Sequence, residues 1–167
     1  NLFQMRKSKA LAKWRNGQPV LGTTLHFHDP SVFEMTSLLG FELIWIDLEH
    51  HAHSVETAGN LMRAARVGGA DILARPAKGE FLRAARLLEA GANGIIYPRC
   101  STAEEARELV RSLKFPPLGI RGLDGAGPDR PYGMNDLRTY LKDANQETFI
   151  LVQIEDPEGL ETASEIA

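Results

Sequence analysis

Five apolar runs alternate with amphipathic stretches along the chain. The runs are short and rich in Val, Ile, Leu and aromatic residues, as buried parallel strands are; they cover residues 19–27, 41–49, 70–76, 93–98 and 149–155. Four intervals between them carry apolar residues at helical spacing, over residues 29–40, 54–69, 79–91 and 102–115. Strands that alternate with helices in this way predict an α/β protein with a parallel sheet.

A stretch rich in Gly and Pro, residues 116–135, breaks this alternation. We expect a long loop there and a short helix over residues 135–144, and long loops in compact domains often carry function. No composition shift divides the chain, so we expect one domain over residues 1–167. Five strands suffice for a doubly wound sheet, whereas a (β/α)8 barrel needs about 250 residues. The pattern alone leaves both architectures open.

Composition and charge narrow the class of protein. The 167 residues are 43% hydrophobic and 25% charged, which is typical of a globular domain with a sizeable core. No run is apolar enough to span a membrane, and a net charge of -3 with mixed signs gives no footprint for nucleic acid. The single cysteine, Cys100, excludes an internal disulfide and fits a reducing compartment. We therefore expect a cytoplasmic protein that acts on a small molecule.

Polar side chains follow most of the predicted strands. In both open architectures the chemistry lies at the carboxyl ends of the strands. Residues two apart in a strand share a face, which places Asp47 and Glu49 together with Trp45 and turns Gln153 and Glu155 inward. The polar residues at the strand ends are His26 and His28 on the first strand, Asp47, Glu49 and His50 on the second, Arg75 on the third, and Gln153 and Glu155 on the fifth.

An inward carboxylate at Glu155 would be costly unless a metal ion or Arg75 compensated its charge. A purely structural Arg75–Glu155 ion pair is an equal alternative. We expect His51 and His53 to be solvated loop residues.

The H-x-H pair of His26 and His28 resembles the metal pair of amidohydrolase barrels, so a metal-dependent hydrolase stays open. All five histidines fall between residues 26 and 53, however, so the later predicted strands supply none of the further histidine ligands that such a barrel needs.

A resemblance to a known family covers the chain from about residue 19 onward. The segments that carry it, in order, are "GFELIWIDLEHHAHS", "ILARP", "LLEAGANGIIYP", "FPPLGIRG" and "ILVQIED". They resemble the HpcH/HpaI aldolases, the metal-dependent class II pyruvate aldolases typified by 4-hydroxy-2-oxoheptanedioate aldolase. The resemblance implies a (β/α)8 barrel of which this chain covers about the first five strands, and we expect the sequence to be incomplete at its C-terminus.

The resemblance also implies roles for individual residues. The D-x-E-H motif makes His50 the catalytic histidine, rather than His51 or His53, and makes Asp47 and Glu49 the acidic neighbours that hold a metal-bound water in the hydrogen-bond network. Arg75 would bind the pyruvyl oxygen and stabilise the enolate. The remaining implied residues are Gln153 at the substrate, Glu155 as a metal ligand, Glu89 as the carboxylate that orients the histidine, and a second metal-binding carboxylate in a G-P-x-D segment expected beyond residue 167.

The implied reaction cleaves a 4-hydroxy-2-oxo acid to pyruvate and an aldehyde, or adds the two. Oxygen ligands favour Mg2+ or Mn2+, with Co2+ and Zn2+ left open, and we expect a homo-oligomer such as a hexamer. The segment "GLDGAGPDRPYG", residues 122–133, departs from the family loop that helps to shape the aldehyde side. Substrate identity therefore stays open, as do a decarboxylase-like relative and a non-catalytic barrel subunit.

Overall fold

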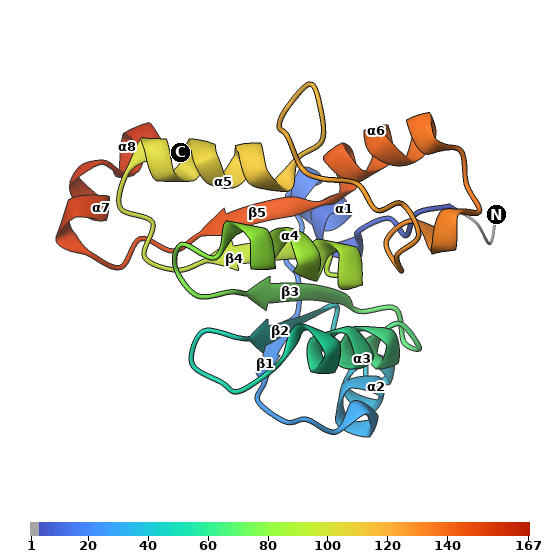
Figure 1. Cartoon of the computed structure of the whole chain (residues 1–167). Helices are drawn as coiled ribbons and strands as arrows, with labels where there is room; N and C mark the ends of the chain where they lie inside the picture. The colour runs from blue at the N-terminus through green and yellow to red at the C-terminus, as the bar shows by residue number, and fades with distance from the viewer. Residues whose placement is uncertain (1–3) are drawn as a thin grey trace.

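Five parallel strands form one sheet in the order β1-β2-β3-β4-β5 (Figure 1). The structure is a computed structural model and describes residues 4–167. The strands are β1 (Gly22–Leu25), β2 (Leu43–Asp47), β3 (Asp71–Arg75), β4 (Gly94–Tyr97) and β5 (Phe149–Val152). All five strands predicted from the apolar runs are present, although β5 ends at Val152, before Gln153 and Glu155.

The helices are α1 (Lys9–Arg15), α2 (Pro30–Leu38), α3 (Val55–Ala65), α4 (Phe81–Ala90), α5 (Ala103–Leu113), α6 (Leu137–Glu147), α7 (Pro157–Glu161) and α8 (Ala163–Ile166), with a short 3-10 turn η1 (Pro131–Gly133). Helices α2 to α6 lie where the sequence predicts helices, and α1, α7 and α8 are additional. Side-chain caps set several helix starts; Ser54 accepts from the backbone N–H of Thr57 at α3, and Thr102 from that of Glu105 at α5.

The strand order distinguishes the two architectures that the sequence leaves open. A doubly wound sheet reverses its order at a switch point, whereas here each strand lies beside its successor in the chain. Each helix from α2 to α5 connects consecutive strands, and α2 packs beside α3, α3 beside α4 and α4 beside α5. This is the arrangement of successive β/α units of a (β/α)8 barrel, over five of its strands.

The core lies between the sheet and these helices. Alternate residues of the strands, such as Ile44, Ile46 and Ile72, are fully buried there, against the apolar stripes of α3 and α4. The opposite face of β2 carries Trp45 and Asp47. The period-2 pattern of a strand therefore separates packing residues from residues free for chemistry, as the sequence predicts.

The Gly/Pro-rich segment is a loop, as expected, but it lies far from the strand carboxyl ends. Arg121 in this loop is buried and pairs with Asp129, Nη2 to Oδ2 at 2.9 Å. The backbone oxygen of Pro128 accepts from Arg66, just past the end of α3. Within one chain the loop thus covers the amino-end edge of the sheet, opposite to where the aldehyde side of the site was expected. In the part of the chain that the structure describes, no helix is long and apolar enough to cross a bilayer.

Close packing between β4 and β5 makes Gly94 a sensitive position. Gly94 lies opposite Phe149 in the sheet, and a Cβ at Gly94 would overlap the Phe149 ring. We expect Gly94→Ala to lower the free energy of unfolding by about 1–3 kcal/mol, the usual cost of overpacking. Gly22→Ala is the control, because the nearest atom to its Cβ would be 3.4 Å away. Urea denaturation measures both, and equal stability of the two variants would contradict the packing argument.

Candidate active site

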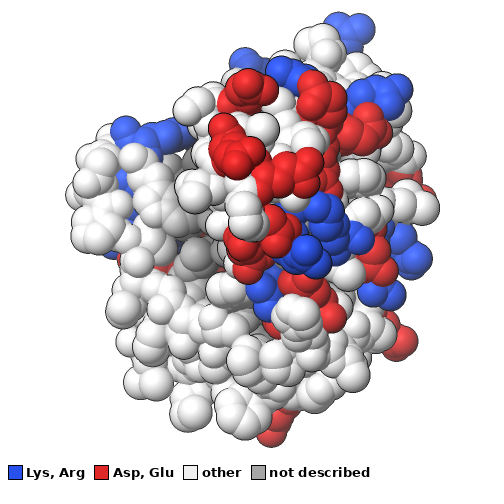
Figure 2. Space-filling model, turned by 90° about the vertical axis from the view of Figure 1, so that its left-hand side faces the viewer, with Lys and Arg blue, Asp and Glu red and all other residues white. Residues whose placement is uncertain are grey.

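The carboxyl ends of the strands form one edge of the molecule, where the arrowheads of Figure 1 point. Figure 2 shows this edge face on: charged side chains gather over its upper and middle parts, and a broad area below them is almost free of them. The exposed residues directly after β1 are His26, Phe27 and His28; they belong to this edge, and none of them is Lys, Arg, Asp or Glu. Acid–base pairs therefore concentrate around the ends of β2 to β5.

Asp47, the last residue of β2, is the centre of this edge. It is 1% exposed and collects donors on both carboxylate oxygens. Its Oδ1 accepts from Arg75 Nε at 2.9 Å and from the backbone N–H groups of Glu49 at 3.0 Å and His50 at 3.4 Å. Its Oδ2 accepts from Arg75 Nη2 at 2.8 Å and bonds His51 Nδ1 at 2.9 Å. Burial alone would raise the pKa of Asp47, but the bonds from Arg75 and His51 outweigh it and hold the pKa well below its usual range.

Arg75, the last residue of β3, faces Asp47 across the sheet. The register pairs the two residues, so the guanidinium meets the carboxylate with two parallel hydrogen bonds. Its Nε also lies 3.3 Å from Glu49 Oε2, and its Cζ lies 4.7 Å from the centre of the Trp45 ring. The hydrogen bond to Asp47 raises the pKa of Arg75, which therefore stays charged. These contacts confirm that Trp45, Asp47 and Glu49 share one face.

Gln153 and Glu155 follow β5, and only Gln153 contacts Arg75 directly. Gln153 Oε1 accepts from Arg75 Nη1 at 3.3 Å, which places the amide beside the guanidinium. Glu155 is exposed, and its Oε2 accepts from the backbone N–H of Arg99 at 3.0 Å. The structural Arg75–Glu155 ion pair considered from the sequence is therefore wrong, because Arg75 pairs with Asp47 and Glu49 instead. The premise of a buried inward carboxylate at Glu155 is wrong too.

The histidines after β2 differ from expectation. His50 is exposed, with its Nε2 3.6 Å from Glu49 Oε2. His51 is half-buried and bonds Asp47. His53 is 5% exposed, and neither of its ring nitrogens has a hydrogen-bond partner among residues 4–167. The expectation that His51 and His53 are solvated loop residues is therefore wrong. A tight turn, in which the His53 N–H donates to the His51 backbone oxygen at 2.8 Å, directs both rings back toward β1.

The two histidines that follow β1 lie against those of the loop, His26 stacked on His51 and His28 tilted against His53. The ring centres of His26 and His51 lie 3.9 Å apart, and those of His28 and His53 lie 4.2 Å apart. Among residues 4–167, no group of three or more His, Cys, Asp or Glu side chains could hold a metal ion. Within this part of the chain the H-x-H pair has no further ligands, so these residues give the hydrolase alternative no support.

Glu89 lies at the far end of the molecule from His50. It sits near the C-terminus of α4, which starts at the carboxyl-end edge and runs back to the opposite one. Its neighbours there are Arg121, Asp124 and Asp129, and burial raises its pKa. Within one chain, therefore, Glu89 does not orient His50.

Strand β4 contributes residues that the sequence analysis did not single out. Arg99 has a left-handed backbone, φ 49°, that residues other than glycine rarely adopt. Its guanidinium bonds Asp156 at 3.1 and 3.4 Å. The end of β4 is also fixed by Tyr97, whose hydroxyl donates to Glu105 at 2.8 Å. The position of Arg99, two residues past an apolar strand, could have marked it as a candidate site residue. Its left-handed backbone conformation could not be predicted from the sequence.

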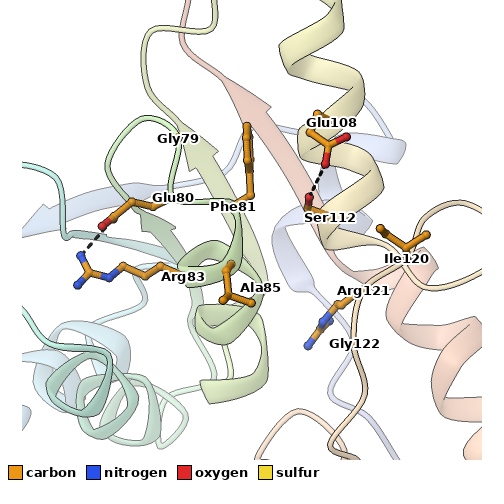
Figure 3. Close-up of a pocket in the computed structure, with 11 residues that line it drawn as sticks. Gly79, Glu80, Phe81, Arg83, Ala85, Glu108, Ser112, Ile120, Arg121 and Gly122 are labelled. Carbon is orange, nitrogen blue, oxygen red and sulfur yellow. Dashed lines mark hydrogen bonds and ion pairs between the residues drawn. The ribbon is translucent and has the colours of Figure 1, made fainter.

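A hollow of about 580 Å³ lies elsewhere, between α4, α5 and residues 120–122 (Figure 3). Glu80 bonds Arg83, and Glu108 bonds Ser112, so the polar side chains there already have partners. None of the site residues expected from the sequence lines it. We therefore place the candidate active site at the carboxyl ends of the strands and not in this hollow.

Comparisons with known proteins agree on one family. The family described as HpcH/HpaI aldolase/citrate lyase matches residues 25–167. The chain is 31% identical to the hydroxypyruvate/pyruvate aldolase of Delftia acidovorans, over 99% of this chain and 61% of that protein. It is 31% identical to the 4-hydroxy-2-oxo-heptane-1,7-dioate aldolase of Escherichia coli, over 93% of this chain and 59% of that protein.

A solved structure shows the same likeness. The crystal structure of an HpcH/HpaI aldolase from Desulfitobacterium hafniense superposes with a TM-score of 0.86 at 30% identity, over 98% of this chain and 62% of that one. The chain thus spans about three fifths of the length of the relatives that it matches.

The buried imidazole of His53 predicts a stability that depends on pH. Burial, followed by the neighbouring His28 and His51, lowers the pKa of His53, and Asp47 opposes this. A histidine with a lowered pKa stabilises the fold above its unfolded pKa of about 6.5, and that stabilisation is lost as the pH falls through the folded pKa. We expect the free energy of unfolding to fall below pH 6.5, and to fall less steeply in His53→Phe, by at most about 1.4 kcal/mol per pH unit. Denaturation across pH 5–8 measures the slope, and an NMR titration of His53 at or above 6.5 would contradict the prediction.

Proposed function

Because the chain belongs to the HpcH/HpaI aldolase/citrate lyase family, we propose that the protein is a metal-dependent aldolase that cleaves or forms 4-hydroxy-2-oxo acids through a pyruvate enolate. The observation that carries the proposal is the charged, fixed guanidinium of Arg75 at the strand carboxyl ends, between Asp47 and Gln153. The names of the relatives support the substrate class, a small 2-oxo acid with an aldehyde as the second component.

Arg75 has donors left for a substrate. A guanidinium carries five N–H groups; Asp47 takes two and Gln153 takes one. One N–H on each terminal nitrogen thus remains for the oxygens of a 2-oxo acid. Enolate formation places negative charge on the carbonyl oxygen, and a fixed cation beside it stabilises that charge without reorganising.

Proton transfer falls to His50 in this proposal. Retro-aldol cleavage removes the proton of the 4-hydroxyl group, which needs a base near neutral pKa. His50 follows the acidic pair on the site edge and its ring is exposed, so a substrate can reach it. Glu89 can orient this histidine only from a neighbouring copy, and its proposed role therefore requires a homo-oligomer, with a hexamer as the expected form.

A lysine Schiff base is a poor alternative. Lys78 lies near the strand ends, but its ammonium bonds the backbone oxygen of Arg99, Ser101 Oγ and Glu105. Lys114, whose pKa burial lowers to about 8, donates to Asn145 and Thr148 beside the amino end of β5. Both ammonium groups are committed to structural hydrogen bonds.

A divalent cation fits the site in part. Glu155 offers an exposed carboxylate close to Gln153 and Arg75, and oxygen donors suit Mg2+ or Mn2+. Residues 4–167 offer no complete set of ligands, so Glu155 would be one ligand among others. When bound, such an ion would supply a second positive charge for the enolate oxygen.

Substitution of Arg75 tests the reaction itself. We expect the unaltered protein with Mg2+ or Mn2+ to exchange the methyl protons of pyruvate in D2O and to release pyruvate from a 4-hydroxy-2-oxo acid. Arg75→Lys keeps one charge but loses the paired bonds to Asp47, so it should lose most turnover, about a hundredfold, and keep the fold. Proton NMR follows both reactions, with circular dichroism as the check on folding. Wild-type rates in Arg75→Lys would make the Asp47–Arg75 pair structural only.

Substitution of Glu155 tests metal binding separately. Glu155→Ala should weaken Mn2+ binding at least tenfold, because removal of a direct ligand costs at least as much as removal of its supporting partners. Glu158→Ala, one exposed carboxylate further along, is the control. Titration followed by electron paramagnetic resonance measures free Mn2+. Equal affinity in both variants would show that Glu155 is not a ligand.

A further inference from the structure

His51 shares the carboxylate of Asp47 with Arg75. Oδ2 of Asp47 lies 2.9 Å from His51 Nδ1 and 2.8 Å from Arg75 Nη2. Two side-chain donors therefore converge on one oxygen, one from the loop after β2 and one from the end of β3. The sequence predicts a solvated loop residue at His51, whereas its ring bonds a buried carboxylate.

The protonation of Asp47 determines which nitrogen of His51 carries a proton. The pKa of Asp47 lies well below its usual range, so the carboxylate is ionised and can only accept hydrogen bonds. The proton must therefore sit on Nδ1 of His51. A charge-assisted bond of this kind is stronger than a neutral one and fixes both groups.

The ring of His51 is itself held in place. It stacks on His26 with ring centres 3.9 Å apart and planes inclined by 24°. Beside it, the His28–His53 pair repeats the arrangement at 4.2 Å without reaching Asp47. His51 is thus fixed on one side by a hydrogen bond and on the other by a stacked ring.

We propose that His51 is a positioning residue of this site, which holds Asp47, and through Asp47 the guanidinium of Arg75, in the geometry that receives a 2-oxo acid. The catalytic part of this inference rests on the proposed function. The positioning part does not, because it concerns contacts within the chain.

The consequence of losing His51 follows from the donors of Asp47. Without the His51 donor, Oδ2 keeps one side-chain partner, Arg75, while Oδ1 keeps Arg75 and two backbone N–H groups. The carboxylate then has one restraint fewer against rotation about its last bond, and any rotation carries the guanidinium with it. Displacements of about 1 Å cost up to a hundredfold in rate. We therefore expect loss of the His51 donor to lower kcat roughly tenfold to a hundredfold, with little change in the affinity for the metal ion.

Two variants separate the hydrogen bond from the stacking. His51→Phe keeps a ring against His26 but removes the donor, whereas His51→Asn removes the ring and places an amide N–H near the position of Nδ1. His28→Phe is the matched control, since it makes the same change in the pair that does not reach Asp47. Exchange of the pyruvate methyl protons in D2O, with saturating Mg2+, measures activity.

We expect His51→Phe to be slowed roughly tenfold to a hundredfold, His51→Asn to recover to within a few fold of the unaltered protein, and His28→Phe to be unchanged. A residue that merely packs would give the opposite order, with His51→Phe active and His51→Asn impaired. That order, or equal activity of all three variants, would overturn the proposal.

A measurement that needs no activity keeps the two proposals apart. Nitrogen-15 NMR of the imidazoles reports the tautomer, and we expect the Nδ1–H form at His51, lost in Asp47→Asn. We also expect faster solvent exchange of the Arg75 Nε–H in His51→Phe than in His28→Phe. If the unaltered protein exchanges no pyruvate protons, the proposed function fails, and these two NMR results still decide the positioning role. An Nε2–H tautomer, or equal Arg75 exchange, would overturn it.

Discussion

The buried carboxylate of Asp47 is the constraint on which the rest of the site depends. A charge that is 1% exposed is stable only when hydrogen bonds replace its lost hydration. Here three side-chain bonds and two backbone bonds do so, from β3 and from the turn that follows β2. One residue thereby determines the path of that turn, the orientation of Arg75 and the tautomer of His51.

The sheet makes this arrangement possible. Register pairs Asp47 with Arg75, and the helices that bury Ile44 and Ile46 on one face leave Trp45 and Asp47 on the other. The Trp45 ring then lies beneath the guanidinium. Packing on one side of β2 and chemistry on the other are therefore two results of the same alternation.

The edge is asymmetric in its chemistry. Over β3 to β5 and α7, charged side chains form short ion pairs, among them Arg99 with Asp156 and Lys78 with Glu105. Beside β1 and β2, imidazoles lie together in two pairs and formal charges are few, as the nearly uncharged area of Figure 2 shows. Asp47 lies where the two regions meet, and its bonds to Arg75 and His51 join them.

The sequence by itself determined the strands, the helices and the inward face of β2, because burial on one side imposes periods of 2 and 3.6 residues that can be read locally. It also placed Asp47, Glu49 and Arg75 at one edge, and the family resemblance predicted the barrel. Only the tertiary structure decided which side chains meet. Arg75 pairs with Asp47 rather than Glu155, His53 is buried, and Glu89 lies at the far edge. The physical reason is that such partnerships depend on the register between strands, the direction of a helix and the path of a turn. Packing against residues distant in sequence sets the register and the helix direction, and it also buries the carboxylate of Asp47 that the turn follows.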